Sequence, residues 1–215
     1  MNIVLLGSPA SGKGTQAELL AKKFGLYILA TGDLSRKIAE TNSRIREIVN
    51  SGKLIPEEEM TMYVFDFLIK TKPDFDNILF EGFPRFVSQY QALDNFLATK
   101  HQALDLVISL DISRVEAIKR ISARRVCASC GEVYNLVTKP SKITNVCDLD
   151  GGSLILRPDD EPKSVAVRFD YYIANTKELI DFLDKNHKLI RVSGERPIET
   201  ISAEINQIIE NYGQN

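Results

Sequence analysis

Short apolar runs alternate with longer amphipathic segments along this chain, and this alternation predicts strands separated by helices. The first apolar run, Ile3-Val4-Leu5-Leu6, predicts a buried strand over residues 2–6. Further strands are predicted at the other short apolar runs, residues 27–29, 77–80, 106–110 and 188–192. Strands that alternate with helices are typical of a parallel sheet covered by helices on both faces.

Helical spacing and helix boundary signals fill the intervals between these strands. Pro56 followed by three glutamates is typical of a helix start, because proline fits the first turn and acids stabilise its positive end. Gly25 is placed to cap the first helix. The segments with helical character are residues 16–24, 31–40, 43–51, 57–71, 88–99 and 113–125, a long segment from 161 and a last one from 197.

The long helix that begins near Glu161 is predicted to bury one face. The residues spaced for that face are Val165, Phe169, Tyr172, Ile173, Thr176, Leu179, Ile180 and Leu183. Residues 126–160 have a different character, because helical periodicity is lost and Gly, Pro, Asn and Thr cluster around short alternating runs. This change predicts an inserted small domain of strands and turns.

Composition narrows the class of protein. A chain of 215 residues, 44% of them hydrophobic, can form one packed core with inserted pieces. A net charge of −2 argues against nucleic acid as the main partner, and no apolar run approaches the ~20 residues that cross a bilayer. Residues 1–6 lack a basic leader, so no signal peptide is expected. Three cysteines cannot all pair within one chain, which favours a reducing, cytoplasmic compartment.

The link between the first strand and the first helix carries the strongest motif. Gly7-Ser8-Pro9-Ala10-Ser11-Gly12-Lys13-Gly14-Thr15 contains the G-x-x-x-x-G-K spacing of a phosphate-binding P-loop. Glycines let backbone N–H groups surround an anion, and the helix N-terminus adds partial positive charge. Lys13 is expected to reach the outer phosphates, and Thr15 the Mg²⁺ of a nucleoside triphosphate. A chance glycine turn is the alternative, which the strand-to-helix context disfavours.

Two further strands deliver polar residues to the same edge of the sheet, where ligands of α/β proteins bind. These residues are Thr31, Asp33 and Arg36 after the second strand, and Glu81, Arg85 and Gln89 after the third. An acid at a strand end beside a P-loop commonly holds Mg²⁺, directly or through water. Glu81 is therefore a candidate, and a plain strand-ending carboxylate is the alternative.

A set of arginines points to phosphate chemistry. Arg120 and Arg124 are four residues apart in the predicted helix 113–125, so they are expected to share one face. A solvated basic face is the alternative, but an anion in front of them would turn repulsion into binding. The cations expected to converge are Lys13, Arg36, Arg85, Arg120, Arg124, Arg157 and Arg168. This charge exceeds the needs of one triphosphate and suits two nucleotides, whose phosphoryl transfer requires positioning and charge neutralisation.

The inserted segment holds a second motif. Cys127-x2-Cys130 is followed after 16 residues by Cys147-x2-Asp150, and two such pairs form a zinc-knuckle pattern. Three thiolates and one carboxylate would close the site to water, so the metal would be structural. A redox Cys-x-x-Cys is a first alternative, and a second is that Asp150 is only a turn residue before Gly151-Gly152.

In these motifs and their order, the chain resembles bacterial-type adenylate kinases, a nucleoside monophosphate kinase family, in their long form with a zinc-bearing lid. The resemblance covers nearly all 215 residues. Ala10 stands where the family usually has glycine, and Glu81 stands where aspartate is usual. The shared motifs are G-x-P-x-x-G-K-G-T-Q, Thr31-Gly32-Asp33 with Arg36, Gly52-Lys53-Leu54, Gly82-Phe83-Pro84-Arg85, Arg124-Arg125-Val126 and Arg157-x-Asp159-Asp160.

The resemblance implies an α/β fold, a P-loop three-layer sandwich with a parallel central sheet. Residues 1–29, 56–122 and 161–215 would form the core, residues 30–55 an inserted helical AMP-binding flap, and residues 123–160 an inserted small zinc-stapled β lid. The implied reaction is Mg²⁺-dependent and reversible, ATP + AMP ⇌ 2 ADP, by a cytoplasmic monomer without nucleic-acid or membrane partners. The alternatives are a UMP or CMP acceptor, and a nucleotide-binding switch without kinase activity.

The resemblance also implies roles for individual residues. ATP would contact Ala10, Ser11, Gly12, Lys13, Gly14, Thr15, Arg120, Arg124, Val133, Tyr134 and Arg196. AMP would contact Thr31, Arg36, Lys53, Leu54, Ile55, Gly82, Phe83, Pro84, Arg85, Gln89, Arg157 and Arg168. The catalytic cations would be Lys13, Arg85, Arg120, Arg124, Arg157 and Arg168. Structural zinc would be held by Cys127, Cys130, Cys147 and Asp150, and Mg²⁺, through water, by Thr15 and Glu81.

Overall fold

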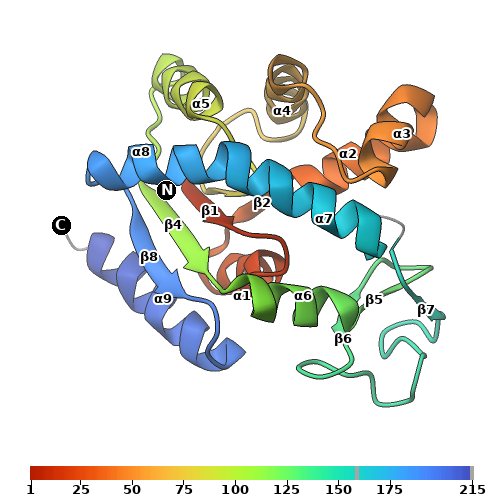
Figure 1. Cartoon of the computed structure of the whole chain (residues 1–215). Helices are drawn as coiled ribbons and strands as arrows, with labels where there is room; N and C mark the ends of the chain where they lie inside the picture. The colour runs from red at the N-terminus through yellow and green to blue at the C-terminus, as the bar shows by residue number, and fades with distance from the viewer. Residues whose placement is uncertain (158–159, 214–215) are drawn as a thin grey trace.

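A five-stranded parallel sheet forms the centre of the computed structural model, which describes residues 1–157 and 160–213 (Figure 1). The strand order is β2-β3-β1-β4-β8, so β1 lies in the middle of the sheet. The strands are β1 (Ile3–Gly7), β2 (Tyr27–Ala30), β3 (Ile78–Glu81), β4 (Leu106–Asp111) and β8 (Ile190–Ser193). The predicted α/β class with a parallel central sheet is confirmed.

Helices fill the intervals between the strands and cover both faces of the sheet. They are α1 (Lys13–Phe24), α2 (Thr31–Thr41), α3 (Ser43–Asn50), α4 (Glu57–Thr71), α5 (Val87–Thr99), α6 (Arg114–Ser122), α7 (Pro162–Tyr171), α8 (Lys177–Lys185) and α9 (Ile198–Tyr212). Among the described residues, no helix has the length and apolar character that crossing a membrane requires.

The two faces of the sheet bury separate apolar clusters because side chains alternate along each strand. Val4 and Leu6 of β1 pack in one cluster with residues of α4, α5 and α8. Ile3 and Leu5 of the same strand pack in the other with residues of α1 and α9. The result is three layers, helices on sheet on helices, as Figure 1 shows.

The segments expected as insertions contain their own elements. Residues 30–55, the flap, contain α2 and α3, and Asn42 caps α3 by accepting a hydrogen bond from the Ile45 N–H at 3.1 Å. Residues 123–160, the lid, contain an antiparallel sheet of three strands, as the turn-rich sequence predicts. Its strands are β5 (Arg124–Cys127), β6 (Val133–Asn135) and β7 (Leu154–Ile155), in the order β6-β5-β7.

The predicted helix 113–125 is wrong at its C-terminal end. α6 ends at Ser122, and Arg124 and Arg125 begin strand β5. The backbone there pairs with β6, Arg124 opposite Asn135 and Arg125 opposite Tyr134, which outweighs local helical spacing. Arg120 and Arg124 therefore do not share a helix face, and successive side chains of β5 point to opposite sides.

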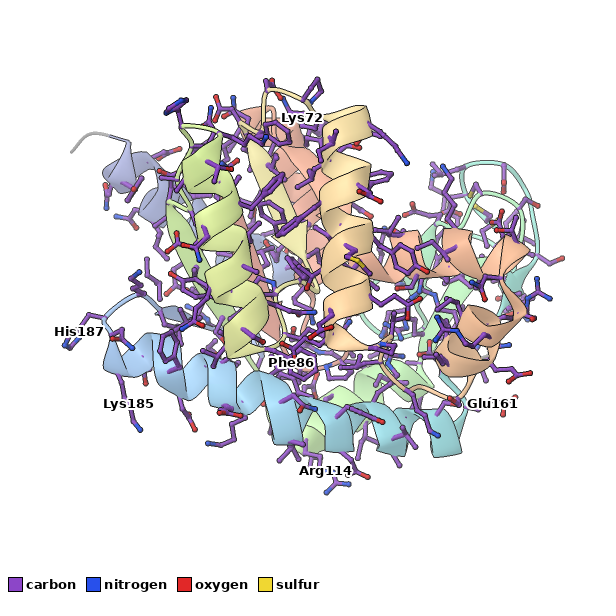
Figure 2. All side chains as sticks on the ribbon, turned by 90° about the horizontal axis from the view of Figure 1, so that it is seen from above. Lys72, Phe86, Arg114, Glu161, Lys185 and His187 are labelled. Carbon is purple, nitrogen blue, oxygen red and sulfur yellow. The ribbon has the colours of Figure 1, made fainter. Side chains whose placement is uncertain are left out.

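The long helix is one continuous rod from Glu161 to Lys185 in Figure 2, but its middle is not α-helical. Residues Tyr172–Thr176 form a π-helical turn between α7 and α8. A π turn is wider than an α-helical turn and carries one extra residue. Ile173 lies within this turn and is 51% exposed, so its predicted place on the buried face is wrong, whereas Phe169 and Leu179 on either side are buried as predicted.

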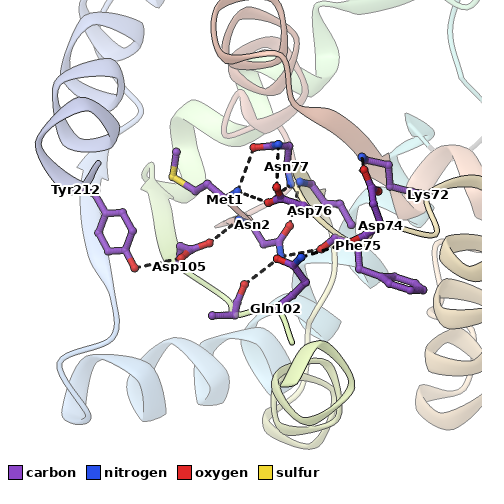
Figure 3. Close-up of polar contacts among 12 residues, drawn as sticks. Met1, Asn2, Lys72, Asp74, Phe75, Asp76, Asn77, Gln102, Asp105 and Tyr212 are labelled. Atoms are coloured by element: carbon purple, nitrogen blue, oxygen red, sulfur yellow. Dashed lines mark hydrogen bonds and ion pairs between the residues drawn. The ribbon is translucent and has the colours of Figure 1, made fainter. Parts of the chain in front are cut away.

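A polar cluster joins β1 to the loops at the N-terminal edge of the sheet (Figure 3). The fully buried Asn2 side chain donates to the carbonyls of Phe75 and Ala103, both at 3.0 Å, and accepts from the Ile78 N–H at 3.0 Å. The α-amino group of Met1 pairs with Asp76. These bonds fix the sheet at the edge opposite the P-loop.

Candidate functional site

The P-loop connects β1 to α1, and its backbone needs glycine at specific points. Gly7 has φ of 143°, and a Cβ there would lie 2.6 Å from the Leu110 carbonyl oxygen. Gly12 caps α1 with φ of 98°. Ala10, where the resembling family usually has glycine, adopts φ of 60°, the left-handed region that disfavours a side chain. The sequence thus retains the loop geometry at the cost of strain at Ala10.

Lys13 folds back over this loop. Its Nζ donates to the carbonyl oxygens of Gly7 at 2.9 Å and Ser8 at 2.8 Å. The pKa of Lys13 is lowered from 10.5 to about 8, mainly by burial; Glu81 opposes this change, and the charges of Arg85, Arg168 and Arg124 add to it. A phosphate group at the loop would supply the missing negative charge and favour the charged ammonium.

A cavity of about 650 Å³ opens at the P-loop, between the flap and the lid. All seven cations singled out in the sequence line it: Lys13, Arg36, Arg85, Arg120, Arg124, Arg157 and Arg168. The P-loop residues from Ala10 to Thr15 and Glu81 also line it, as do Gly82, Pro84, Val133, Tyr134 and Arg196. Planar guanidinium groups bind phosphate oxygens in pairs of hydrogen bonds, so the cavity suits ligands with several phosphates.

A smaller cavity of about 100 Å³ lies against the flap and shares Arg36, Arg85 and Arg168 with the main one. Its wall includes six more of the residues expected to hold a second nucleotide, namely Thr31, Lys53, Leu54, Ile55, Gly82 and Gln89, whereas Pro84 and Arg157 line only the main cavity. Phe83, from the same predicted set, lines neither cavity, because its side chain is fully buried in the core. The two cavities meet at three arginines, where phosphates of two ligands would come together.

Gln89 holds the loop after β3 in place. Its Oε1 accepts from the Arg85 backbone N–H at 2.8 Å, and its Nε2 donates to the Glu57 carbonyl at 3.1 Å. An amide oxygen accepts two hydrogen bonds and an amide nitrogen donates two, so each retains capacity for a ligand. Burial and the neighbouring Arg168 lower the pKa of the Arg85 guanidinium, and Glu81 opposes that change.

Asp160 joins two of the arginines. Its side chain is 0% exposed, accepts from Arg124 Nε at 2.7 Å and Arg168 Nη1 at 2.9 Å, and pairs again with Arg124 Nη2. Burial alone would raise the pKa of Asp160, but the hydrogen bond from Arg124 and the charges of Arg124, Arg168 and Arg157 outweigh burial and lower the pKa. The carboxylate is therefore charged and holds one arginine from the lid beside one from α7.

Arg120 and Arg124 reach the cavity from different elements. Arg120 extends from α6 and donates from Nε to Glu116 at 2.8 Å, whereas Arg124 extends from β5. Arg125, the next residue of β5, donates to the carbonyls of Ser122 and Arg124 and does not line the cavity. Successive side chains of a strand point to opposite sides, so Arg124 faces the cavity and the neighbouring Arg125 does not.

Cys127, Cys130, Cys147 and Asp150 meet in the lid, with all four potential ligand atoms within 4.8 Å of one another. The Cys130 and Cys147 sulfurs lie 3.6 Å apart, close to the ~3.8 Å that zinc–sulfur bonds of ~2.3 Å give in a tetrahedron. The Gly152 N–H, then the thiols of Cys147 and Cys127, lower the pKa of Asp150 to about 2, so this carboxylate is charged. The four residues could therefore hold a metal ion, and their chemistry fits zinc.

Two residues of the site had no assigned role in the sequence. Asp160 belongs to the motif Arg157-x-Asp159-Asp160, which was the available signal, and Asp159 lies outside the described residues. Gln16 ends the motif G-x-P-x-x-G-K-G-T-Q, and only the structure shows that it lines the main cavity.

Comparisons with known proteins show which family the chain resembles. A family model described as "Adenylate kinase" matches residues 5–188. The chain is 37% identical over 214 residues to the adenylate kinase of Thermosipho africanus, a match that covers 97% of this chain and 99% of the relative. It is 36% identical to the adenylate kinase of Thermoanaerobacter sp., with full coverage of both. It is 35% identical to that of Staphylococcus aureus, covering 98% and 99%.

Proposed function

Because this chain belongs to the adenylate kinase family, we propose that the cavity between flap, lid and P-loop is where its reaction takes place. The protein is a phosphotransferase, and family and relatives support the reaction ATP + AMP ⇌ 2 ADP. The observation that carries the proposal is the convergence of seven cations on one cavity with a P-loop at its base.

We assign ATP to the P-loop side and AMP to the flap side. The triphosphate would displace Lys13 Nζ from the Gly7 and Ser8 carbonyls, and Arg120 and Arg124 would neutralise its phosphates. The AMP phosphate would lie at Arg36 and Arg85, with its base near Gln89. The amide of Gln89 offers one acceptor and one donor, the pair that reads the adenine edge.

Arg157 and Arg168 are proposed to neutralise the transferring phosphoryl group between the two ligands. Asp160 orients Arg124 and Arg168 toward each other, so less ordering is required when substrates bind. No general base is required, because the attacking atom is an oxygen of the AMP phosphate. Closure of the lid would exclude water, the competing acceptor.

Two metals are part of the proposal. The Thr15 hydroxyl and the Glu81 carboxylate line the cavity and fit Mg²⁺, a cation that prefers oxygen ligands, with water between. Mg²⁺ supplies charge neutralisation of the phosphates. Zinc at Cys127, Cys130, Cys147 and Asp150 would hold the lid together. We further propose that the protein is a cytoplasmic monomer. Its three cysteines form no disulfide, which supports a reducing compartment.

The test is a two-substrate assay of ADP formation with ATP and AMP, with and without Mg²⁺. Mg²⁺-dependent ADP formation is expected. Replacing AMP by CMP or UMP should lower the rate, and a higher rate with UMP would contradict the choice of acceptor. ATP binding without any ADP formation would instead indicate a nucleotide-binding switch.

A further inference from the structure

The two arginines assigned to the donor phosphates belong to different elements, and their spacing depends on the junction between those elements. Arg120 belongs to α6, Arg124 begins β5, and only Ala123 lies between the helix and the strand. The last four carbonyl oxygens of a helix have no partner inside the helix. Groups from elsewhere can therefore bond to them and fix the direction in which the chain leaves the helix.

Asn135 of β6 provides such a bond. Its side-chain Nδ2 donates to the Arg120 carbonyl oxygen at 3.1 Å. The next residue, Leu136, donates its backbone N–H to the Ala123 carbonyl oxygen at 2.8 Å. Asn135 also lies opposite Arg124 in the register of β5 and β6. One dipeptide of the lid is therefore bonded to the chain along the whole junction from α6 to β5.

The other end of the Asn135 amide holds the loop that follows β6. Its Oδ1 accepts from the backbone N–H groups of Val137 at 2.9 Å and Thr138 at 3.1 Å. A carbonyl oxygen needs a donor and an N–H group needs an acceptor, so these bonds fix which end of the amide is nitrogen. The backbone of Asn135 exchanges two more hydrogen bonds with Lys139, both at 3.0 Å. The side chain thus joins α6 at one end to a loop of the lid at the other.

We propose that Asn135 is a positioning residue, which holds Arg120 in place relative to Arg124 for binding of the donor phosphates. Both arginines line the main cavity. Glu116 already holds the Arg120 side chain by accepting from Nε at 2.8 Å, so the placement of this arginine depends on its backbone. A misplacement of about 1 Å in a site can lower the rate by about two orders of magnitude. The inference rests on the proposed function, which assigns the donor phosphates to these two arginines.

Asn135→Ser separates the two ends of the amide. A serine hydroxyl can still accept from the backbone N–H groups of the following loop, but it is too short to reach the Arg120 carbonyl oxygen. At saturating AMP, kcat/KM for ATP should fall roughly 10-fold in Asn135→Ser and equally in Asn135→Ala, while KM for AMP changes less than about 2-fold. A folded serine variant with the wild-type kcat/KM would assign the side chain to the loop alone and overturn the inference.

A double-mutant cycle with Arg120→Ala shows whether the loss passes through Arg120. Once the guanidinium is removed its position no longer matters, so Asn135→Ser should change kcat/KM less than about 2-fold in Arg120→Ala protein. The full roughly 10-fold loss in that background would overturn the inference, because Asn135 would then act independently of Arg120. Loss of folded protein has a different signature, since it lowers kcat in both backgrounds and leaves both KM values unchanged.

Asn186→Ala provides a matched control. Asn186 Nδ2 donates to the Phe182 carbonyl oxygen at 2.7 Å at the C-terminal end of α8, the same kind of bond, but Asn186 does not line the main cavity. Its loss should leave kcat/KM for ATP within about 2-fold of the wild-type value. A 10-fold loss there would show that any weakened helix end suffices, and would overturn the inference. If the proposed function itself fails, the wild-type protein forms no ADP from ATP and AMP.

Discussion

The flap and the lid line the same cavity, yet different interactions hold them in shape. Ala39, Ile45 and Ile55 of the flap belong to the apolar cluster that also contains the sheet residues Val4 and Leu6. The buried cluster of the lid is separate and small: Cys127, Tyr134, Cys147 and Leu154. The flap is therefore an extension of the core, whereas the lid depends on its cysteine cluster, since segments this small rarely supply enough apolar burial.

The flap also docks on the helix that carries Arg168. Ser164 Oγ of α7 donates to the Asn50 carbonyl at 2.9 Å, and Gly52 lies so close that a Cβ would be 2.4 Å from the Ser164 carbonyl oxygen. Its φ of 74° favours glycine as well. The lid reaches the same helix through charge, by Arg124, Asp160 and Arg168. Packing positions one insertion, and ion pairs and a cysteine cluster position the other.

The largest effect is expected from the ion pairs of the lid. Arg124→Ala should lower kcat/KM by ~10²–10³-fold, because it removes a cation aimed at developing phosphate charge. Asp160 keeps Arg168 as a partner, so the core should remain folded. Steady-state ADP formation measures the loss. Arg125→Ala is the control, since this side chain lies outside the cavity. Similar losses in both variants would show that the strand, not the guanidinium, is responsible.

The next largest effect is expected from metal removal, which should disturb the lid but not the flap. Cys147→Ser, or chelation of the bound metal, should unfold the lid and lower the rate by ~10-fold or more, because structural zinc supplies folding energy outright. Hydrogen exchange should increase in residues 124–155 and stay unchanged in α2 and α3. Zinc content of the purified protein should fall from one per chain to near zero. Equal exchange in lid and flap would contradict the contrast between them.

Ile45→Ala should disturb the flap and leave the lid unchanged, with a smaller effect on the rate. Ile45 is 0% exposed in the main core, so its truncation should cost ~2–5 kcal/mol of unfolding free energy. KM for AMP should rise while the metal content stays at one. Urea unfolding and AMP titration measure the two quantities. Ile143→Ala in the lid, where the side chain is 66% exposed, is the matched control and should change neither.

The smallest expected effect is a pH dependence of ATP binding at the P-loop, which lies beneath both the flap and the lid. The pKa of Lys13 without ligand is about 8, below its ordinary 10.5, so the ammonium loses its proton as pH rises through 8. ATP favours the charged form. ATP affinity should therefore be constant below pH 7 and weaken above pH 8, with proton uptake on binding. Calorimetry in buffers of different ionisation enthalpy measures this uptake. Lys13→Arg stays charged and should show none; uptake that persists there would exclude Lys13 as its source.

Short sequence patterns correctly predicted the elements that depend only on neighbouring residues. The apolar run before Gly7, the glycines of the P-loop and the acids after Pro56 each act within a few residues, and the structure has the strand, loop and helix they indicate. Arg124 was misplaced because β5 forms only when β6 and β7 pair with it, and residues far along the chain supply that pairing.

Other features required the folded chain. Ile173 is exposed within a π turn, and hydrophobic spacing does not predict such a turn. Asp160 carried no signal beyond its motif, since its role is to meet two arginines from different elements. Gln16 reads as an ordinary polar helix residue until the structure places it at the main cavity.

A crystal structure with AMP, Mg²⁺ and a non-hydrolysable ATP analogue tests the central claim most directly. The claim is that one cavity between flap and lid binds both nucleotides with their phosphates end to end. The predicted result has the triphosphate on the P-loop, AMP against the flap, and Arg85, Arg124 and Arg168 within hydrogen-bonding distance of phosphate oxygens. Nucleotides bound elsewhere, or these arginines turned away from the phosphates, would contradict the account.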